Sequence, residues 1–315
     1  MGTTIRNSKK KPALRTGRPP TAAKPKRSIS SKATQKTIVT FHKYAPPPKT
    51  QKPALRPLLI LPFLIRSLSK ELQKAKTRDD KERVSAIENQ IDQLGGIKAY
   101  QEASIQGQAV DRGGDTSIVL LNWLKPVQQD LAQLDSKFKL LEVGALSTKN
   151  ACSKSGLFDV TRIDLNSQGP GIEQQDFMER PLPPSSEEQF DIISLSLVVN
   201  FVPDATTRGE MLKYTTHFLR SRPSPPAILT DYRALLFLVL PAPCTLHSRY
   251  FNEERLALIM AELGYAMVNR KETRKLVYSL WQLCDKPPSK MQNFPKVKVR
   301  DGAKLNNFHI VLDRD

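Results

Sequence analysis

The stretch Lys139–Leu165, KLLEVGALSTKNACSKSGLFDVTRIDL, holds two short β-rich runs, 139–143 and 161–165, with a glycine directly after the first. Beyond this stretch, short apolar runs continue to alternate with segments of helical spacing. We expect further strands at 190–195, 235–240, 266–270 and 276–283, and helices at 207–219 and 253–263. Strands that alternate with helices in this way predict an α/β fold, in which a mostly parallel, doubly wound sheet is covered by helices on both faces.

The region before the first strand has a different pattern. Apolar residues recur at roughly helical spacing over 58–76, 80–94, 97–105 and 116–134, and Gly95-Gly96 ends the second of these segments. We therefore divide the chain into a basic arm, a helical section, an α/β domain and a basic C-terminal extension, at residues 1–56, 57–134, 135–285 and 286–315.

The positive charge is concentrated at the N-terminus. The 315 residues include 49 Lys and Arg against 31 Asp and Glu, a net charge of +18, and residues 1–56 carry +15 of it without a single acid. This arm has few large apolar side chains, so burial cannot offset its ordering entropy and we predict disorder. Lys9–Lys11 and Lys24–Arg27 are candidate nuclear-import signals. Phosphate contact on nucleic acid is a second possible role, and a solubilising tail is a third.

Composition argues against several classes of protein. The three Cys and four His show no metal-ligand spacing, so we expect neither a disulfide framework nor a metal site. The longest apolar run near the start, Leu58–Ile65, is well short of the roughly 20 residues that span a membrane, and no secretory signal is visible. We expect a soluble protein of a reducing compartment without a metal or membrane partner, and its oligomeric state stays open.

Ligands of doubly wound sheets bind at the carboxyl ends of the strands. Gly144 follows the first strand, and Asp164 lies in the second strand's end 20 residues later, which is the spacing at which an acid receives the two hydroxyls of an adenosyl ribose. Asp176 follows at the next expected strand end, where it could accept from an adenine amino group while an apolar neighbour, Phe177, packs on the ring. The second and third glycines of a dinucleotide fingerprint are missing, which favours S-adenosylmethionine.

Four stretches resemble the fungal nucleolar large-subunit (25S) rRNA adenine-N(1) methyltransferases: YQEASIQGQAVDRGGDTSIVLLNWL (100–124), LLEVGALSTKNACSKSGLFDVTRIDLNSQGPGIEQQDFMERPLP (140–183), FDIISLSLVVNFVPDATTRGEMLKY (190–214) and LLFLVLPAPCTLHSRYFNEERLALIMAELGY (235–265). The resemblance covers about Tyr100–Leu283. It implies a class I methyltransferase fold, with Gly144 and Asp164 at cofactor-binding positions, and a nuclear, nucleolar enzyme acting on rRNA or a pre-ribosome. The proline-rich segment 221–226 departs from the family pattern. Related animal proteins are S-adenosylmethionine sensors, so a non-catalytic sensor acting through a protein partner is the alternative function.

The chemistry of adenine N1 suggests which residues act on the base. N1 has a free lone pair at neutral pH and needs no general base, but its edge lies inside Watson–Crick pairs, so the base must be unpaired or flipped. Asn200-Phe201-Val202-Pro203 follows the fourth strand and loosely resembles the Asn-Pro-Pro-aromatic loop of amino-group methyltransferases. We expect Asn200 to read the adenine edge and Phe201 to stack on the ring. The alternatives are a helix N-cap for Asn200 and core packing for Phe201.

Arg112 lies in a polar segment that ends in Gly113-Gly114. This segment could fold over the cofactor or target, and Arg112 could then contact a phosphate or the methionine carboxylate. Alternatively, it is a connector whose glycines only make a turn.

Overall fold

The computed structural model describes residues 67–68, 71–72, 75–76, 78–96, 114–134, 136–167, 169–220, 232, 234–284 and 292–313. The chain divides into two units, residues 1–51 and 52–315, and all described residues belong to the second unit. The predicted basic arm, the predicted helix at 97–105, Arg112 and the proline-rich segment 221–226 lie outside the described residues.

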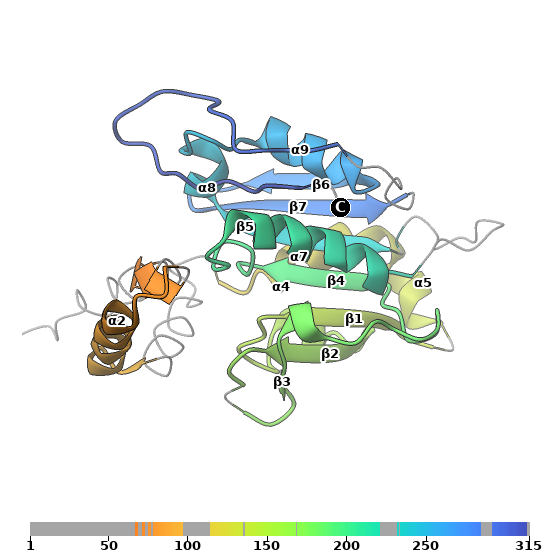
Figure 1. The fold of residues 1–315 in the computed structure, drawn as a ribbon. Helices are drawn as coiled ribbons and strands as arrows, with labels where there is room; N and C mark the ends of the chain where they lie inside the picture. The colour runs from red at the N-terminus through yellow and green to blue at the C-terminus, as the bar shows by residue number, and fades with distance from the viewer. Residues whose placement is uncertain are drawn as a thin grey trace, which may run out of the picture. The chain divides into compact units, whose positions relative to one another are not determined.

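The described residues form a seven-stranded sheet with the order β3-β2-β1-β4-β5-β7-β6 (Figure 1). The first five of these strands are parallel to one another, and β7 is antiparallel to both β5 and β6. This arrangement confirms the predicted α/β fold. The strands are β1 Phe138–Val143, β2 Phe158–Asp164, β3 Glu173–Gln174, β4 Ile192–Ser196, β5 Leu235–Pro241, β6 Tyr265–Glu272 and β7 Leu276–Leu283.

Helices cover both faces of this sheet, with α7 and α9 on one face and α4 and α5 on the other (Figure 1). The described helices are α2 Lys81–Gln93, α4 Ser117–Trp123, α5 Gln128–Ala132, α6 Ala151–Lys154, α7 Ala205–Phe218, α8 Ala242–Leu246 and α9 Glu253–Glu262, with the short 3-10 helices η2 Lys125–Val127 and η3 Phe177–Glu179.

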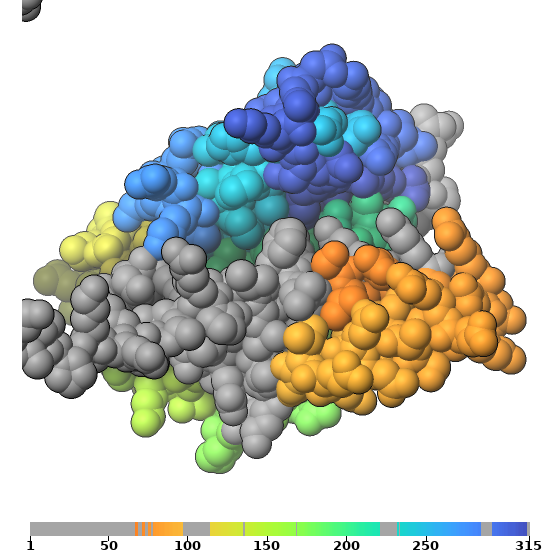
Figure 2. All heavy atoms as spheres, turned by 90° about the vertical axis from the view of Figure 1, so that its left-hand side faces the viewer, coloured from red at the N-terminus to blue at the C-terminus, as the bar shows by residue number. Residues whose placement is uncertain are grey.

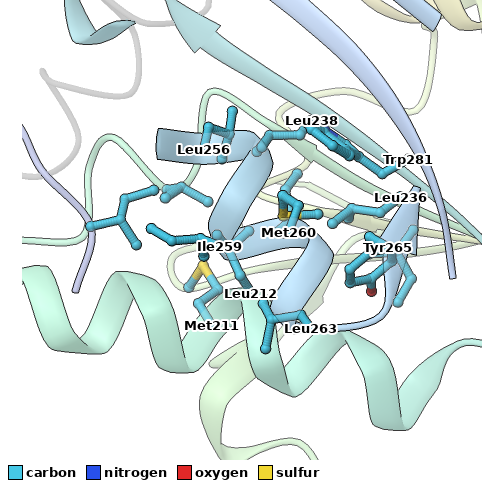
Figure 3. Packing of buried hydrophobic residues seen from close by; sticks show 14 of the residues in the cluster. Met211, Leu212, Leu236, Leu238, Leu256, Ile259, Met260, Leu263, Tyr265 and Trp281 are labelled. Carbon is cyan, nitrogen blue, oxygen red and sulfur yellow. The ribbon is translucent and has the colours of Figure 1, made fainter. Parts of the chain in front are cut away.

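Alternation along the strands creates two cores. Leu141 of β1 is buried with the helices α7 and α9, whereas its neighbour Leu140 is buried with α4 and α5, because successive strand residues point to opposite faces. Figure 3 shows the first of these cores, in which Ile259 and Met260 of α9 lie between α7 and the strand residues Leu236 and Leu238.

Side-chain caps and proline explain several helix boundaries. The carboxylate of Asp204 accepts a hydrogen bond from the backbone N of Thr207 at 2.9 Å and starts α7. The segment 116–134 was predicted to be one helix, but α4 ends at Trp123 and η2 and α5 follow separately. Pro126 lies in η2, where its missing N–H and its ring interrupt the helical hydrogen-bond pattern.

The C-terminal strap, as we call residues 292–313, runs without helix but joins the core. Phe294 and Leu312 form an antiparallel bridge, and the side chains of Phe308 and Ile310 are buried in the core under α7 and α9. Figure 2 shows the dark-blue strap against the cyan segment that follows β5. Residues 286–315 were predicted to be an extension separate from the α/β domain, but the described part of this segment shares that domain's core.

Candidate functional site

The sheet order places a topological switch point between β1 and β4. From β1 the chain continues to β2 and β3 on one side, and then crosses to β4 and β5 on the other side. Ligands of such sheets bind outside the carboxyl ends of the two strands that flank the switch point. The loops that begin there are the one after β1, at Gly144, and the one after β4, at residues 197–203.

Gly144 is a point of close contact between the loops after β1 and β4. Its φ is +73°, in the left-handed region that favours glycine. A Cβ added at Gly144 would lie 2.7 Å from Cγ2 of Val198 in the loop after β4. The Gly144 backbone N donates to the carbonyl O of Ile163 at 2.8 Å, which ties this turn to β2. Only glycine therefore satisfies both the backbone conformation and the close packing at the switch point.

The predicted adenosine contacts follow the neighbouring strands. Asp164 is half-buried at the end of β2, and its Oδ1 accepts from the backbone N of Asn166 at 2.8 Å. Asp176 follows β3, and its Oδ1 accepts from the backbone N of Met178 at 2.8 Å, so it caps η3. Asp164 ends β2, which neighbours β1, and Asp176 follows β3, which neighbours β2 at the edge of the sheet. The contacts of both carboxylates with a cofactor stay predictions.

Phe177 lies in the hydrophobic core. Only 2% of it is exposed, and its ring contacts the rings of Tyr214 and Phe218 at centroid distances of 5.5 and 5.4 Å. The ring of Phe177 is therefore enclosed by α7, and its predicted stacking on an adenine ring stays a prediction.

The loop after β4 presents one buried amide and one exposed aromatic ring. Leu197 has a φ of +61°, which is rare for a residue with a side chain and turns the chain sharply at the strand end. Asn200 is then only 1% exposed, whereas Phe201 is 41% exposed. The N-cap of α7 is Asp204, so Asn200 does not have the alternative role of a cap, and Phe201 is not a core residue.

Arg208 of α7 fixes this loop to the C-terminal strap. Its buried guanidinium donates to the carbonyls of Val202 and Pro203, at 2.8 and 2.9 Å, and to the carbonyl of His309 at 2.6 Å. The guanidinium carbon also lies 4.8 Å from the ring centroid of Phe308. One side chain therefore links the loop that holds Asn200 and Phe201 to a segment about 100 residues away in sequence.

A polar network involves Glu142, which lies in β1 two residues before Gly144. Glu142 of β1 accepts from Nδ2 of Asn150 through Oε1 at 2.6 Å, while among the described residues its buried Oε2 has no hydrogen-bond partner. Burial raises the pKa of Glu142, against the lowering effects of Asn150 and Arg162, and the nearby Asp115 raises it further. A buried carboxylate oxygen at the end of β1 is well suited to receive a hydrogen-bond donor from a ligand.

Asp115 joins the start of α4 to the same edge of the sheet. Its Oδ2 accepts from the backbone N of Ala151 at 2.5 Å, and its Oδ1 accepts from the backbone N of Ser117 at 3.0 Å. Thr116 and Ser196, at the end of β4, share a hydrogen bond of 2.8 Å between their hydroxyls. Asp115 and Thr116 therefore link the start of α4 to the start of α6 and to the end of β4, and the predicted contact residue Arg112 lies outside the described residues.

Sequence reasoning missed Glu142, Asp115 and Arg208. Asp115-Thr116-Ser117 is a group of capping residues before an apolar run, which is a recognisable helix start. Glu142 precedes the glycine of the cofactor loop by two residues and could have been noticed as a carboxylate within a buried strand. Arg208 gave no signal, because its partners are backbone carbonyls that only the folded chain brings together.

In the described ranges, no cluster of three or more His, Cys, Asp or Glu side chains is placed to hold a metal ion. None of the helices in this part of the chain combines the length and the apolar character needed to cross a membrane.

The sheet order, the switch point and the glycine after β1 define a class I methyltransferase fold. The sequence profile of the family described as "25S rRNA (adenine(2142)-N(1))-methyltransferase, Bmt2" matches residues 85–310, and the chain belongs to this family. The match extends further towards both termini than the stretches that carry the resemblance in the sequence.

Two curated relatives carry similar names. The 25S rRNA (adenine(2142)-N(1))-methyltransferase of Saccharomyces cerevisiae is 40% identical over 72% of this chain and 63% of its own length. The 25S rRNA adenine-N(1) methyltransferase of Schizosaccharomyces pombe is 40% identical over 73% of this chain and 81% of its own length. Among solved structures, the N-methyltransferase NodS of Bradyrhizobium japonicum in complex with S-adenosyl-L-homocysteine is 14% identical, with a TM-score of 0.32 over 52% of this chain and 88% of that one. We draw no conclusion from that structural likeness.

Proposed function

We propose that this protein is an enzyme that transfers a methyl group from S-adenosylmethionine to N1 of an adenine in large-subunit rRNA. The observation that carries the proposal is the pairing of a buried amide, Asn200, with an exposed ring, Phe201, in the loop after β4, whose Val198 packs against Gly144 at the switch point. The names of the two yeast relatives point to the same reaction.

The residues at the switch point fit the cofactor. When bound, S-adenosylmethionine supplies an electrophilic methyl group on a sulfonium. Asp164 would accept from the ribose hydroxyls at the end of β2, and Asp176 would accept from the adenine amino group of the cofactor. The buried Oε2 of Glu142 offers a further acceptor for the hydroxyl or ammonium donors that this cofactor carries. Gly144 keeps the turn between these groups free of a side chain.

The loop after β4 would bind the target base. Its Asn200 side chain can accept from the exocyclic amino group of adenine, which leaves the N1 lone pair free to attack the methyl group. The exposed ring of Phe201 can stack on a base that has left its pair. No proton has to leave N1 before the attack, so the site needs no general base. The residues of the loop hold the base in line for transfer, and we assign them no other step.

Methyl transfer is better supported than cofactor sensing. A sensor needs a cofactor pocket and a protein partner, but it has no use for an exposed ring beside a buried amide at the open end of β4. The acid-free charge of residues 1–56 also suits RNA contact and nuclear import. We therefore propose the nucleolus, where rRNA is processed, as the place of action.

Variants of the base-binding loop test the proposal. Stacking is worth about 1–3 kcal/mol per base, so Phe201→Ala should lower single-turnover methylation of an rRNA fragment about tenfold or more. Phe201→Tyr should restore most of the rate because it keeps the ring. Leu258→Ala, at a 55% exposed position on α9, is the matched control and should change nothing.

Calorimetry of the same proteins with S-adenosylmethionine separates the base site from the cofactor site. Affinity for the cofactor should stay near that of the wild type in Phe201→Ala and in Asn200→Ala. An equal loss of cofactor affinity in these variants would show that the pair supports the fold and does not hold the base.

A further inference from the structure

Residues 295–304 of the C-terminal strap form a surface loop, the excursion, that leaves the core. Phe294 and Leu312 near the ends of the strap form an antiparallel bridge, Phe308 and Ile310 are buried in the core, and the excursion lies between these core contacts. The excursion is exposed along almost its whole length. The excursion therefore has a fixed base and presents its side chains to solvent.

The C-terminal strap passes along α8 and is bonded to it. Asn306 donates from its backbone N to the carbonyl of His247 at 2.8 Å and from Nδ2 to the carbonyl of Pro243 at 2.6 Å. Arg300 donates to the carbonyls of Leu246 and Thr245, so this cation is used to hold the strap. On the other side of α8, the backbone N of Ala242 donates to the carbonyl of Lys275 at 2.8 Å. The strap, α8 and the turn between β6 and β7 therefore form one continuous surface.

This surface collects the positive charge of the folded part of the chain. Residues 247–250, 271–275 and 292–309 contain eight Lys and Arg and two acids, a net charge of +6 in 27 residues. The other 232 residues of 57–315 have a net charge of −3. We name it the basic strap surface and define it by its exposed cations Lys271, Arg274, Lys275, Lys296, Lys298 and Lys304. The guanidinium of Arg249, like that of Arg300, bonds to the strap itself.

Both acids within these segments already have a cation partner. Glu272 contacts Arg270 at 2.5 Å, and Asp301 forms an ion pair with Lys298. Two half-buried rings lie among the cations: Nζ of Lys296 is 4.2 Å from the ring centroid of Tyr250, and that ring is 5.9 Å from His309. Cations interleaved with rings are typical of surfaces that bind a nucleic-acid strand through its phosphates and bases.

The basic strap surface adjoins the candidate base-binding loop. α8 begins where β5 ends, and β5 is the neighbour of β4 in the sheet, so both features lie at the carboxyl edge. Arg208 makes the connection direct, because its guanidinium bonds to His309 of the strap and to Val202 and Pro203 of the loop. A strand that delivers a base to Phe201 must continue along this edge on at least one side.

We propose that the basic strap surface binds the phosphate backbone of the substrate RNA next to the target base. The inference rests on the proposed function, and it adds a docking site on the folded domain that is separate from the N-terminal basic arm. The C-terminal strap thereby has two roles: its buried residues hold the base-binding loop, and its exposed lysines hold the RNA that the loop reads.

The test compares two double variants of the full-length protein. Lys296→Gln/Lys304→Gln removes two exposed cations of the strap, while Lys125→Gln/Lys137→Gln removes two exposed cations in η2 and before β1. Binding of a large-subunit rRNA fragment is titrated at several salt concentrations. Each lost phosphate contact lowers the magnitude of the slope of log affinity against log salt by about 0.7 to 0.9. The slope of the strap variant, which loses two contacts, should therefore be smaller by about 1.4 to 1.8. Its affinity for the RNA should be about ten- to thirtyfold weaker near physiological salt. The control variant should keep the wild-type slope and affinity.

Methyl transfer measured on the same proteins separates this inference from the proposed function. At saturating RNA the strap variant should methylate at the wild-type rate, because its site is intact and only docking is weakened. An unchanged slope and affinity in the strap variant would overturn the inference and leave an acidic protein surface as the partner of these cations. An equal loss in the control variant would also overturn it, since net charge alone would then explain binding. If the strap variant binds RNA more weakly but the wild type transfers no methyl group, the inference is upheld and the proposed function is refuted.

Discussion

Replacing Gly209 by Ala should detach the C-terminal strap from α7. Gly209 lies in the first half of this helix, and a Cβ added there would lie 1.9 Å from the carbonyl O of Val311 and 2.9 Å from its carbonyl C. The nearest atoms are backbone, so no side-chain rotation can relieve the overlap. The strap has to move by about 1.5 Å to reach ordinary van der Waals distance. That movement would break the 3.0 Å hydrogen bond from the Val311 N to the carbonyl of Ala205.

Whether Gly209→Ala raises or lowers the unfolding free energy shows whether the strap packs against α7. In a helix without a close neighbour, Gly→Ala stabilises by about 1 kcal/mol. Here, overpacking costs about 1–3 kcal/mol and the lost hydrogen bond about 1 kcal/mol, which outweighs that gain. We expect a net loss of about 1–3 kcal/mol of unfolding free energy, and a fall in Tm of about 2–4 °C for each kcal/mol.

Thermal unfolding by circular dichroism measures this change, with Gly169→Ala as the control. Nothing lies within 4 Å of a Cβ added at Gly169, and we expect its Tm to stay within about a degree of the wild type. Methyl transfer by Gly209→Ala should fall more than its cofactor affinity, because the displaced strap loosens the hold of Arg208 on the base-binding loop. A raised Tm in Gly209→Ala would refute the packing of the strap on α7.

Four further predictions concern the cofactor, the reactivity and ionisation of the cysteines, and the arm. Asp164→Ala should weaken S-adenosylmethionine binding by about tenfold to a hundredfold in calorimetry, since a hydrogen bond to a charged group contributes about 1.5–3 kcal/mol, while RNA affinity stays near normal. Burial raises the pKa of Cys152 from 9.0 to about 12, so a thiol reagent at neutral pH should modify the exposed Cys284 and reach Cys152 only after unfolding. The same shift means that stability should fall as pH rises from about 9 towards 12, because only the unfolded thiol ionises there. Deleting residues 1–56 should flatten the salt dependence of RNA binding and leave the cofactor affinity unchanged.

The local pattern of apolar residues is sufficient to predict the central strands of the sheet. The strands around Gly144 and Asp164 are short buried runs with clear ends, so their positions and the spacing between these two residues can be predicted. Asn200 and Phe201 could be placed for the same reason, as residues a few positions beyond the end of β4. Which of them is buried could not be read from the sequence, because the turn at Leu197 decides it.

The C-terminal strap shows where pattern reasoning stops. Phe294, Phe308, Ile310 and Leu312 follow no helical or strand period over the whole segment, and prolines and lysines surround the first of them. Their burial depends on contacts with the core that α7 and α9 share, which form only in the folded chain. The burial of Phe177 could not be predicted for a related reason, since its strand-end position gave no sign that α7 would enclose its ring.

The most direct test of the account is to map N1-methyladenosine in large-subunit rRNA at nucleotide resolution. Unmodified rRNA is incubated with S-adenosylmethionine and either the wild-type protein or Asp164→Ala/Phe201→Ala, and rRNA from cells lacking the protein is mapped in parallel. We predict one N1-methyladenosine that the wild type installs, that the double variant fails to install, and that is missing from the mutant cells. Full methylation in cells without the protein, or equal transfer by the double variant, would contradict the assignment of this reaction to the site between β1 and β4.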